Sequence, residues 1–391
     1  MNIHSDQQSN VHNSGQFFAK LNETIATLQL AGKDILRLDV GSPDMPPPKA
    51  VIDTLSRSAA VSSHHGYQAH NATRTLRTAW AGFYRQNHNV ELDPDREVLP
   101  LIGSKEGIFH ILQTALEPGD TVIIPDPGYL TYRQGAIFAK AKPYALRLRP
   151  ENNYLPDFAE IPAEVAHQAK MMWLNYPNNP TGATATRTNL EQAVDFAREH
   201  DLLLCHDAAY SQVTYDGYDA PSVLQVPGSI DHAIEFNSLS KSFNMAGWRS
   251  GVAVGQQKAL RALYALKTNT DSGHFRPILD AAVQALKTDP AWIHKRNTVY
   301  QKRRDLVVNA FYAIGVKIPK PKGAIYIWFP VPPKMSAESF VGSLLEHYQV
   351  SLTPGTVFGP GGEGYVRLSY TIQEESLSEA MQRITKYYIS I

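Results

Sequence analysis

The sequence has little of several features that would define a protein class by themselves. It contains one cysteine in 391 residues, so an internal disulfide is excluded. Cys205 lies in the apolar run LLLC and is predicted to be a buried strand residue in a reducing compartment. No run approaches the ~18 apolar residues that a membrane-spanning helix needs. The polar amino-terminal stretch lacks the apolar segment of a signal peptide, so we expect a cytoplasmic protein.

The formal net charge of the sequence at pH 7 is zero. Lys plus Arg and Asp plus Glu each number 37, so no overall field would draw the protein to nucleic acid or to an acidic membrane. Hydrophobic residues make up 43% and charged residues 19%, which is typical of a globular protein. There is no internal repeat and no low-complexity linker. Any anion that binds must therefore be held by a local site.

Strands and helices are predicted to alternate through the middle of the chain. Helical apolar spacing separates seven strand-like segments, which are EVLPLIG, TVIIPDPGY, KPYALRL, KMMWLN, DLLLCHD, IEFNSL and GVAVG. Alternation of this kind favours an α/β fold with a largely parallel sheet covered on both faces. A long helical stretch is expected from residue 257 to about 286 and another over 292–314, followed by an α+β unit.

The segment from Ile234 to Gly255, IEFNSLSKSFNMAGWRSGVAVG, carries the first candidate for chemistry. Lys241 follows a buried strand, and an α/β sheet usually presents its site at the carboxyl ends of its strands. An amine in a partly dry pocket has a lowered pKa and can attack a carbonyl to form a Schiff base. Ser238 and Arg249 lie nearby in the chain.

Further candidates follow other predicted strands. The turn Gly103-Ser104-Lys105 precedes a helix predicted to start at Glu106, an arrangement that can direct N–H groups at a phosphate. Asp207 ends an apolar strand, where a carboxylate needs a cation nearby. Arg367 stands between two apolar residues and needs an anion.

The segment SLSKSFNMAGWRSG resembles the lysine segment of the fold-type I, pyridoxal-phosphate-dependent aminotransferases of classes I and II. The motifs PDPGY, NYPNNPTG, HDAAY and GYVRLSY match the family in its order, and the resemblance runs from about Leu36 to the carboxyl terminus. It implies a large domain around a mostly parallel seven-stranded sheet, a smaller α+β domain from both termini, pyridoxal 5'-phosphate as cofactor, and a homodimer. The implied substrates are an amino acid and a 2-oxo acid.

The resemblance also implies a role for each matching residue. Lys241 would form the Schiff base and move the proton, Asp207 would pair with the pyridine nitrogen, and Tyr210 would donate to the phenolic oxygen. The remaining cofactor contacts would come from Ser104, Lys105, Tyr129, Asn179, Ser238, Arg249 and, across a dimer interface, Tyr67. The substrate would be bound by Gly41, Asn179 and Arg367, while His206 is interpreted as structural. No metal ligand is among the candidates.

These positions suggest a division of the chain into three parts. Residues 1–47 would form an amino-terminal arm and part of the small domain, with residues 1 to about 15 as the arm itself. Residues 48–290 would form the large cofactor-binding domain, and residues 291–391 the small domain. Because Gly41 and Arg367 come from opposite ends of the chain, we expect the small domain to close over the substrate.

A narrower resemblance exists to bacterial enzymes of the LL-diaminopimelate aminotransferase type, through LIGSKEGIFH, KTNTDSG and TPGTVFG. Two positions depart from it. His70 stands where plant-like members carry an acidic residue facing the substrate's distal ammonium, and Gln16 lies in GQFF where they have a tyrosine-containing segment. A further departure is from the wider family, which usually has a glycine five residues after Tyr67, where this chain has Ala72. Alanine, aspartate or methionine aminotransferases and a β-lyase on the same scaffold therefore stay open as alternatives. A DNA-binding regulator is disfavoured because the polar head is too short for a helix-turn-helix domain.

Overall fold

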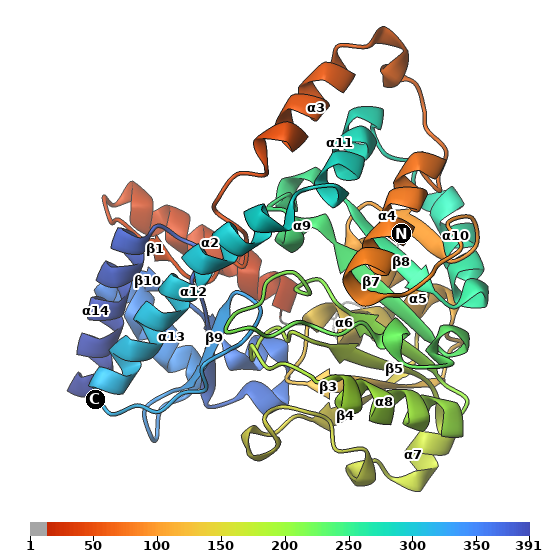
Figure 1. Ribbon diagram of the computed structural model, residues 1–391. Coiled ribbons are helices and arrows are strands. Elements are labelled where there is room, and N and C mark those ends of the chain that lie inside the picture. The colour runs from red at the N-terminus through yellow and green to blue at the C-terminus, as the bar shows by residue number, and fades with distance from the viewer. Residues whose placement is uncertain (1–13) are drawn as a thin grey trace, which may run out of the picture.

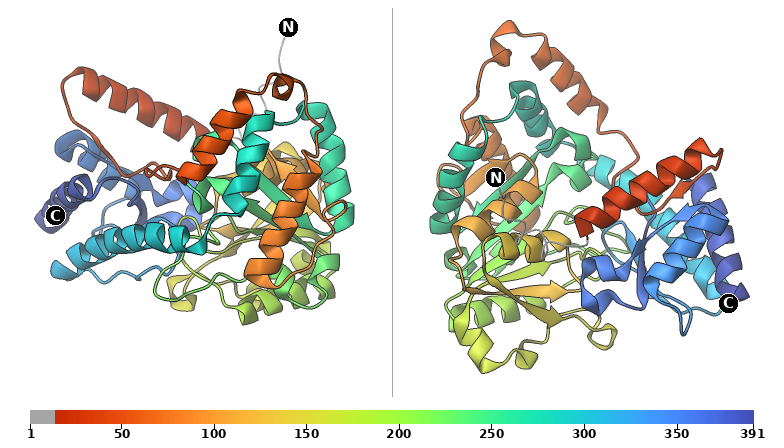
Figure 2. Two further views of the ribbon diagram at one scale, coloured as in Figure 1. Left: turned by 45° about the horizontal axis from the view of Figure 1, so that its top comes forward. Right: turned by 180° about the vertical axis from the view of Figure 1, so that it is seen from behind.

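The computed structural model describes residues 14–391, so residues 1–13 of the expected arm lie outside the described part of the chain. A seven-stranded sheet lies beside a smaller unit that contains a three-stranded and a two-stranded sheet, and helix α12 (Pro290–Ala313) passes between the two parts (Figures 1 and 2). None of the described helices is long and apolar enough to cross a bilayer.

The larger sheet has seven strands, in the spatial order β2-β8-β7-β6-β5-β3-β4. They are β2 (Val98–Leu101), β3 (Thr121–Asp126), β4 (Lys142–Arg147), β5 (Ala169–Asn175), β6 (Leu203–Asp207), β7 (Ala233–Ser238) and β8 (Gly251–Gly255). Strand β8 runs antiparallel to β2 and β7, and the other neighbours are parallel. The predicted α/β fold with a mostly parallel seven-stranded sheet is thus confirmed.

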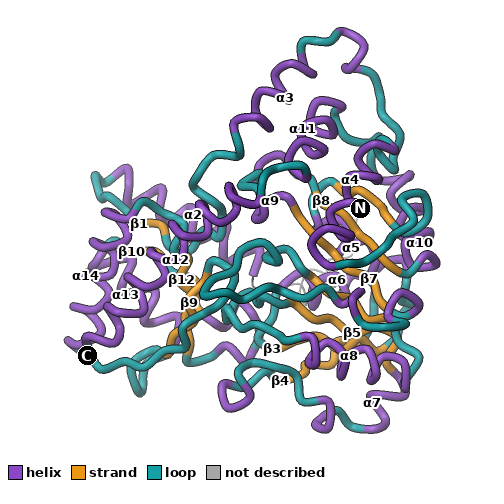
Figure 3. The backbone as a smooth tube through the Cα atoms, in the orientation of Figure 1, coloured by secondary structure: helices purple, strands orange, loops and turns teal. Residues whose placement is uncertain are grey.

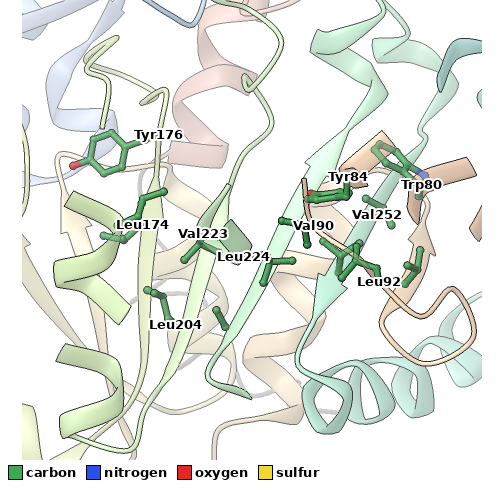
Figure 4. Packing of buried hydrophobic residues seen from close by; sticks show 14 of the residues in the cluster. Trp80, Tyr84, Val90, Leu92, Leu174, Tyr176, Leu204, Val223, Leu224 and Val252 are labelled. Atoms are coloured by element: carbon green, nitrogen blue, oxygen red, sulfur yellow. The ribbon is translucent and has the colours of Figure 1, made fainter. Parts of the chain in front are cut away.

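Helices cover both faces of this sheet, which explains why β7 and β8 are buried along their whole length and β5 at all positions except Lys170. The covering helices are α4 (Arg74–His88), α5 (Ser104–Thr114), α6 (Leu130–Phe138), α8 (Arg187–Glu199), α10 (Gln257–Thr270) and α11 (Arg276–Leu286). One apolar layer joins α5, α6 and α10 to the sheet, and the other joins α4, α8 and α11. Figure 4 shows part of the second layer, where Trp80 and Tyr84 of α4 lie near Val252 of β8. A short helix, α7 (Ala163–Gln168), leads into β5.

The second unit combines both ends of the described chain. Its antiparallel sheet has the order β11-β12-β9, and β1 pairs in parallel with β10. These elements are β1 (Leu36–Arg37), β9 (Tyr326–Pro330), β10 (Val350–Ser351), β11 (Thr353–Pro354), β12 (Tyr365–Ser369), α2 (Ser14–Leu30), α13 (Ala337–Tyr348) and α14 (Glu374–Ser390). Leu38 shares one apolar cluster with Phe311, Ile327 and Ile384. The α+β unit is as predicted; the exact limits 1–47, 48–290 and 291–391 stay a prediction.

Two predicted boundaries were wrong. The single helical stretch expected over residues 257–286 is two helices, α10 and α11, separated at residues 271–275. Gly273 in this break has φ +80°, and a Cβ there would lie 2.6 Å from the Gln68 carbonyl oxygen, so the chain bends where another loop approaches closely. Helix α5 begins at Ser104, two residues earlier than expected, with Gly103 as its N-cap.

Helix α3 (Lys49–Ala59) stands apart from the sheets and packs mainly on α11 (Figures 1 and 3). Only Val51 and Ser58 of its residues are buried. The loop from Gly66 to Thr73 then leads back to α4. Helix α3 is therefore less buried than the helices that cover the large sheet.

Candidate active site

The predicted site residues surround one cavity of about 260 Å³ between the two parts. The cavity lies where the loops after β5, β6 and β7 meet the second unit. Its lining consists of Gly41, Ser104, Lys105, Tyr129, Asn175, Asn179, Asp207, Ala209, Tyr210, Ser238, Ser240, Lys241, Ala246, Arg249, Tyr326 and Arg367. Every predicted site residue except Tyr67 is present. A larger cleft of about 1460 Å³, beside α4 and the start of α12, contains none of them.

Lys241 lies in α9 (Leu239–Ser242), the short helix that follows β7. Its Nζ donates a hydrogen bond to the carbonyl oxygen of Gly41, which comes from the other end of the chain. Burial, with the positive charges of Arg367 and Arg249, lowers the pKa of the Lys241 amine from 10.5 to about 8. About a tenth of this amine is therefore neutral at pH 7, far more than for an ordinary lysine, and the neutral form is what a nucleophile or a base requires.

Asp207 ends β6 and is 5% exposed. Its Oδ2 accepts a hydrogen bond of 2.8 Å from the Tyr132 hydroxyl, and its Oδ1 accepts one of 3.2 Å from the N–H of Ala209. No ion pair joins it to a cation among residues 14–391, and burial raises the pKa of its carboxyl. A carboxylate placed this way in a cavity suits a cationic group on a ligand. Tyr132 was not predicted, although it follows Tyr129 by three residues on α6.

Two tyrosine hydroxyls meet on the opposite wall. Tyr210 Oη and Tyr326 Oη are 2.7 Å apart, and burial raises the pKa of Tyr210 well above its usual range. Both hydroxyls therefore stay protonated and one can donate to a ligand. Tyr326 was missed by sequence reasoning, because a tyrosine in an apolar strand is common. A Cβ on Gly41 would overlap its hydroxyl, so only glycine allows this approach of the two segments.

An anion cradle is formed by the start of α5 and the turn after Lys241. Gly103 has φ +80° and a Cβ there would overlap the Arg249 guanidinium, so the helix start and this arginine are in close contact. The Arg249 Nη1 donates to the Ala246 carbonyl at 2.9 Å. Ser238 and Ser240 add hydroxyls to the same end of the cavity. Helix N–H groups, hydroxyls and a guanidinium together suit a phosphate.

Arg367 lies on β12 and has no carboxylate partner among the described residues. Its Nη1 donates to Asn179 Oδ1 at 3.0 Å and its Nη2 to the Asp39 carbonyl at 2.8 Å. The rings of Tyr326 and Phe358 cover its two faces, with centroids 4.4 and 4.7 Å from Cζ. Its Nε is buried without a hydrogen-bond partner. A held guanidinium with an unpaired donor suits a carboxylate ligand.

Tyr67 lies away from this cavity. It is 92% exposed in the loop between α3 and α4. In the same loop, Ala72 has φ +58°, the left-handed backbone that glycine would favour, so the loop keeps that conformation without a glycine. His70 Nδ1 lies 3.8 Å from Asp271 Oδ1. His206 pairs with buried Glu235 at 2.8 Å and does not line the cavity, in keeping with a structural role.

Fold and cavity together define the class of protein. A lysine amine of lowered pKa, a buried carboxylate without a cation, and an anion cradle converge at the carboxyl edge of a mostly parallel sheet. These groups fit the aldehyde, the ring nitrogen and the phosphate of pyridoxal 5'-phosphate. The protein is a fold-type I enzyme that uses this cofactor.

Comparisons with known proteins specify the family. The model of the aminotransferase class I and II family matches residues 33–384, so the chain belongs to this family and is a transaminase. It is 44% identical over 369 residues to the LL-diaminopimelate aminotransferase of Moorella thermoacetica, covering 94% of this chain and 95% of the relative.

Solved structures agree with this assignment. Substrate-bound BacF of Bacillus subtilis superposes with a TM-score of 0.94 at 35% identity, over 99% of this chain and 98% of that chain. A double mutant of Thermus thermophilus aspartate aminotransferase gives 0.92 at 28% identity, over 99% and 100%. These neighbours carry the same fold on related sequences.

Proposed function

We propose that this aminotransferase interconverts LL-diaminopimelate and its 2-oxo counterpart, tetrahydrodipicolinate in its cyclic form, with glutamate and 2-oxoglutarate as the second pair. The observation that carries this is the 44% identity to the Moorella thermoacetica enzyme over almost the whole of both chains. Lys105 and Tyr129, which lie in segments that resemble enzymes of this type, are part of the cavity wall.

The cofactor would be held by the groups that surround the cavity. Its phosphate would lie at the start of α5, against Ser104, Lys105, Ser238 and Arg249. Tyr129 would stack on the ring, and Asn179 with Tyr210 would contact the phenolic oxygen. When bound, the cofactor supplies a cationic ring that accepts the electrons released as the substrate Cα–H bond breaks.

Three side chains would then carry the reaction. Asp207 would keep the ring nitrogen protonated through a charge pair that its buried position makes strong. Lys241, as a neutral amine, would take the proton from the substrate Cα and return it to the cofactor's aldehyde carbon, C4′. The reverse with the second substrate would complete a ping-pong cycle. Tyr210 would donate a hydrogen bond to the phenolic oxygen.

The substrate's α-carboxylate would bind the free edge of Arg367, with the Gly41 backbone close by. The distal end is where specificity is decided. His70 is beside Asp271 rather than free, and the side chain of Gln16 lies outside the described residues. Alanine, aspartate or methionine as donors, and β-lyase chemistry, are therefore the alternatives to exclude.

We also propose a homodimer in the cytoplasm. Tyr67 would reach the phosphate of the partner subunit, since it is 92% exposed and does not line its own cavity. Apolar side chains near this loop are also exposed, with Ile52 at 37%, Val61 at 42% and Phe275 at 43%. A second copy of the chain would cover them. The division into residues 1–47, 48–290 and 291–391 is part of the same proposal.

A single-turnover panel tests the substrate. Purified holoenzyme is mixed separately with LL-diaminopimelate, glutamate, alanine, aspartate and methionine, and the cofactor spectrum is followed. Conversion to the amine form by LL-diaminopimelate and glutamate, at rates at least about tenfold above the other three, is the expected result. Faster conversion by alanine, aspartate or methionine would reject this substrate pair. Release of pyruvate together with ammonia over many turnovers, without any added 2-oxo acid as acceptor, would indicate a β-lyase.

A further inference from the structure

The loop between β11 and β12 is unusually tight. It consists of two short 3-10 turns, η7 (Gly355–Phe358) and η8 (Pro360–Gly362). A Cβ on Gly355 would overlap the Gly362 carbonyl oxygen, and one on Gly362 would overlap the Gly355 carbonyl oxygen. The two ends of the loop are therefore in direct backbone contact. A loop this compact transmits a displacement at one end to the other.

One end of this loop is fixed to the larger sheet by Asp126, the last residue of β3, which is 1% exposed. Asp126 Oδ1 accepts a hydrogen bond of 2.9 Å from the N–H of Gly361, and Oδ2 lies 3.3 Å from Arg147 Nη1. Gly359 has φ +124° and a Cβ there would overlap Asp126 Oδ1. The carboxylate is thus enclosed by the loop, and the loop's glycines allow that approach.

Phe358, at the end of η7 and directly before Gly359, reaches the proposed substrate arginine. The Phe358 ring covers one face of the Arg367 guanidinium, 4.7 Å from Cζ. The Phe358 carbonyl also accepts a 2.9 Å hydrogen bond from the N–H of Gly128, two residues after Asp126. Phe358 packs in an apolar cluster with Leu148 from the larger sheet's side and Trp328 of β9. Phe358 therefore links Arg367 to the segment around Asp126.

We propose that Asp126 is a positioning residue for substrate binding: by holding η8 through Gly361, it fixes Phe358 against Arg367 and so sets the position of the carboxylate-binding guanidinium. The inference rests on the proposed role of Arg367. Asp126 touches neither the cavity nor any group proposed to hold the cofactor. Its loss should therefore weaken binding of the amino-acid substrate and leave cofactor binding unchanged.

The test compares Asp126→Ala with Asp126→Asn. Asparagine keeps an oxygen for the Gly361 N–H but removes the charge beside Arg147, whereas alanine removes the acceptor. Gly361→Ala is a second route to the same defect, since its Cβ would lie 2.9 Å from Asp126 O and Oδ1 and must displace the loop. Glu160→Ala, which breaks the exposed ion pair with Arg149, is the matched control.

Each holoenzyme variant is mixed with increasing concentrations of the donor that converts the wild-type cofactor fastest, so that the test does not depend on which donor is natural. The half-saturating donor concentration and the limiting rate are read from the cofactor spectrum. Cofactor affinity and melting temperature are measured on the same samples. For Asp126→Ala and Gly361→Ala we expect the half-saturating concentration to rise about tenfold, with a limiting rate within about threefold of wild type.

Near wild-type behaviour of Asp126→Asn and Glu160→Ala completes the expected pattern. The inference is overturned if Asp126→Ala loses cofactor or limiting rate while the half-saturating concentration stays constant. It is also overturned if Asp126→Asn is as impaired as alanine. If Asp126→Ala does not fold, the asparagine and Gly361→Ala variants decide the question. A failed role for Arg367 is distinguished because Arg367→Lys would then leave donor saturation unchanged.

Discussion

At the scale of single residues, the surroundings of Lys241 change the pKa of its amine and so its reactivity. Burial removes water from the amine, and two arginines add unfavourable charge, so its pKa falls to about 8. The protein holds a protonated Lys241 at a cost in stability. That cost is the price of a base that is ready at neutral pH.

This cost predicts a pH dependence of the cofactor-free protein. Between pH 8 and 10.5 the unfolded state binds more protons at this lysine than the native state does, so its contribution to the free energy of unfolding rises with pH. Below pH 8 the full penalty is present, and above 10.5 it is gone. Relative to Lys241→Met, wild type should gain up to about 3 kcal/mol across this window.

Urea unfolding of both proteins at pH 7.5, 9 and 10.5 measures the effect. Only the difference between wild type and Lys241→Met matters, because other titrating groups are common to the two. Parallel curves for the two proteins would show that the amine is not perturbed in the native state. Melting curves at the same pH values serve as an independent check on the direction.

The residues of the site were largely predictable because they occur in short segments that keep their spacing. Lys241, Asp207, Asn179 and Arg367 each follow or interrupt an apolar strand, and that placement is visible in the sequence. Tyr326 and Asp126 were not found. Their importance comes from contacts with Gly41 and Gly361, each more than 200 positions away in the chain, and no local pattern reports such a contact.

At the scale of elements, the sequence predicted the strands better than the helix ends. Buried strands are marked by unbroken apolar runs, whereas the break between α10 and α11 depends on Gly273 fitting beneath the Gln68 carbonyl. The early start of α5 depends on Gly103, whose positive φ ends the strand segment and caps the helix. Each glycine lies against a residue that is distant in the sequence, Gln68 for Gly273 and Arg249 for Gly103, so local helix propensity does not predict these two helix ends.

A buried ion cluster fastens α10 to α5. Lys267 Nζ, on a side chain 2% exposed, lies 3.1 Å from Glu106 Oε1 and 2.6 Å from Asp271 Oδ2. Glu106 Oε2 also accepts the N–H of Ile102, just before the anion cradle. Lys267 thus pairs with two carboxylates, Glu106 in the first turn of α5 and Asp271 at the end of α10. Removing it would leave both charges in a poorly hydrated place.

We therefore predict that Lys267→Met lowers the free energy of unfolding by about 3–5 kcal/mol. Adding Glu106→Gln should recover at least about 1 kcal/mol of this loss, because one of the two stranded charges is then removed. Lys49→Met, which breaks an exposed pair with Asp53, is the control and should cost less than about 0.5 kcal/mol. Urea titrations of five proteins measure these values: wild type, Lys267→Met, Glu106→Gln, the double variant and Lys49→Met. Simple additivity of the two buried changes would contradict the account.

At the scale of the whole molecule, one chain encloses a cavity that contains almost every predicted cofactor group, and the exception is informative. Tyr67 lies in the loop after α3, the helix that stands away from the sheets (Figure 2). Although α11 packs against α3, the side chain of Tyr67 is 92% exposed in the described chain. If a symmetric partner covers it, each Tyr67 belongs to the cavity of the other subunit.

That arrangement predicts complementation between two defective proteins. Lys241→Ala lacks the proposed Schiff-base lysine, and Tyr67→Ala lacks the proposed phosphate contact given to the partner. In a mixed dimer, one cavity has its own Lys241 and the Tyr67 supplied by the Lys241→Ala subunit, so it is complete; the other cavity lacks both. Random exchange of equal amounts makes half of the dimers mixed, each with one complete cavity of two. At a cofactor concentration too low to saturate Tyr67→Ala, activity should rise to about one quarter of wild type.

The measurement is turnover before and after subunit exchange, with wild type mixed with Lys241→Ala as the control. If Tyr67 served its own cavity, each mixed dimer would keep only defective sites, and activity would stay at the average of the two parents.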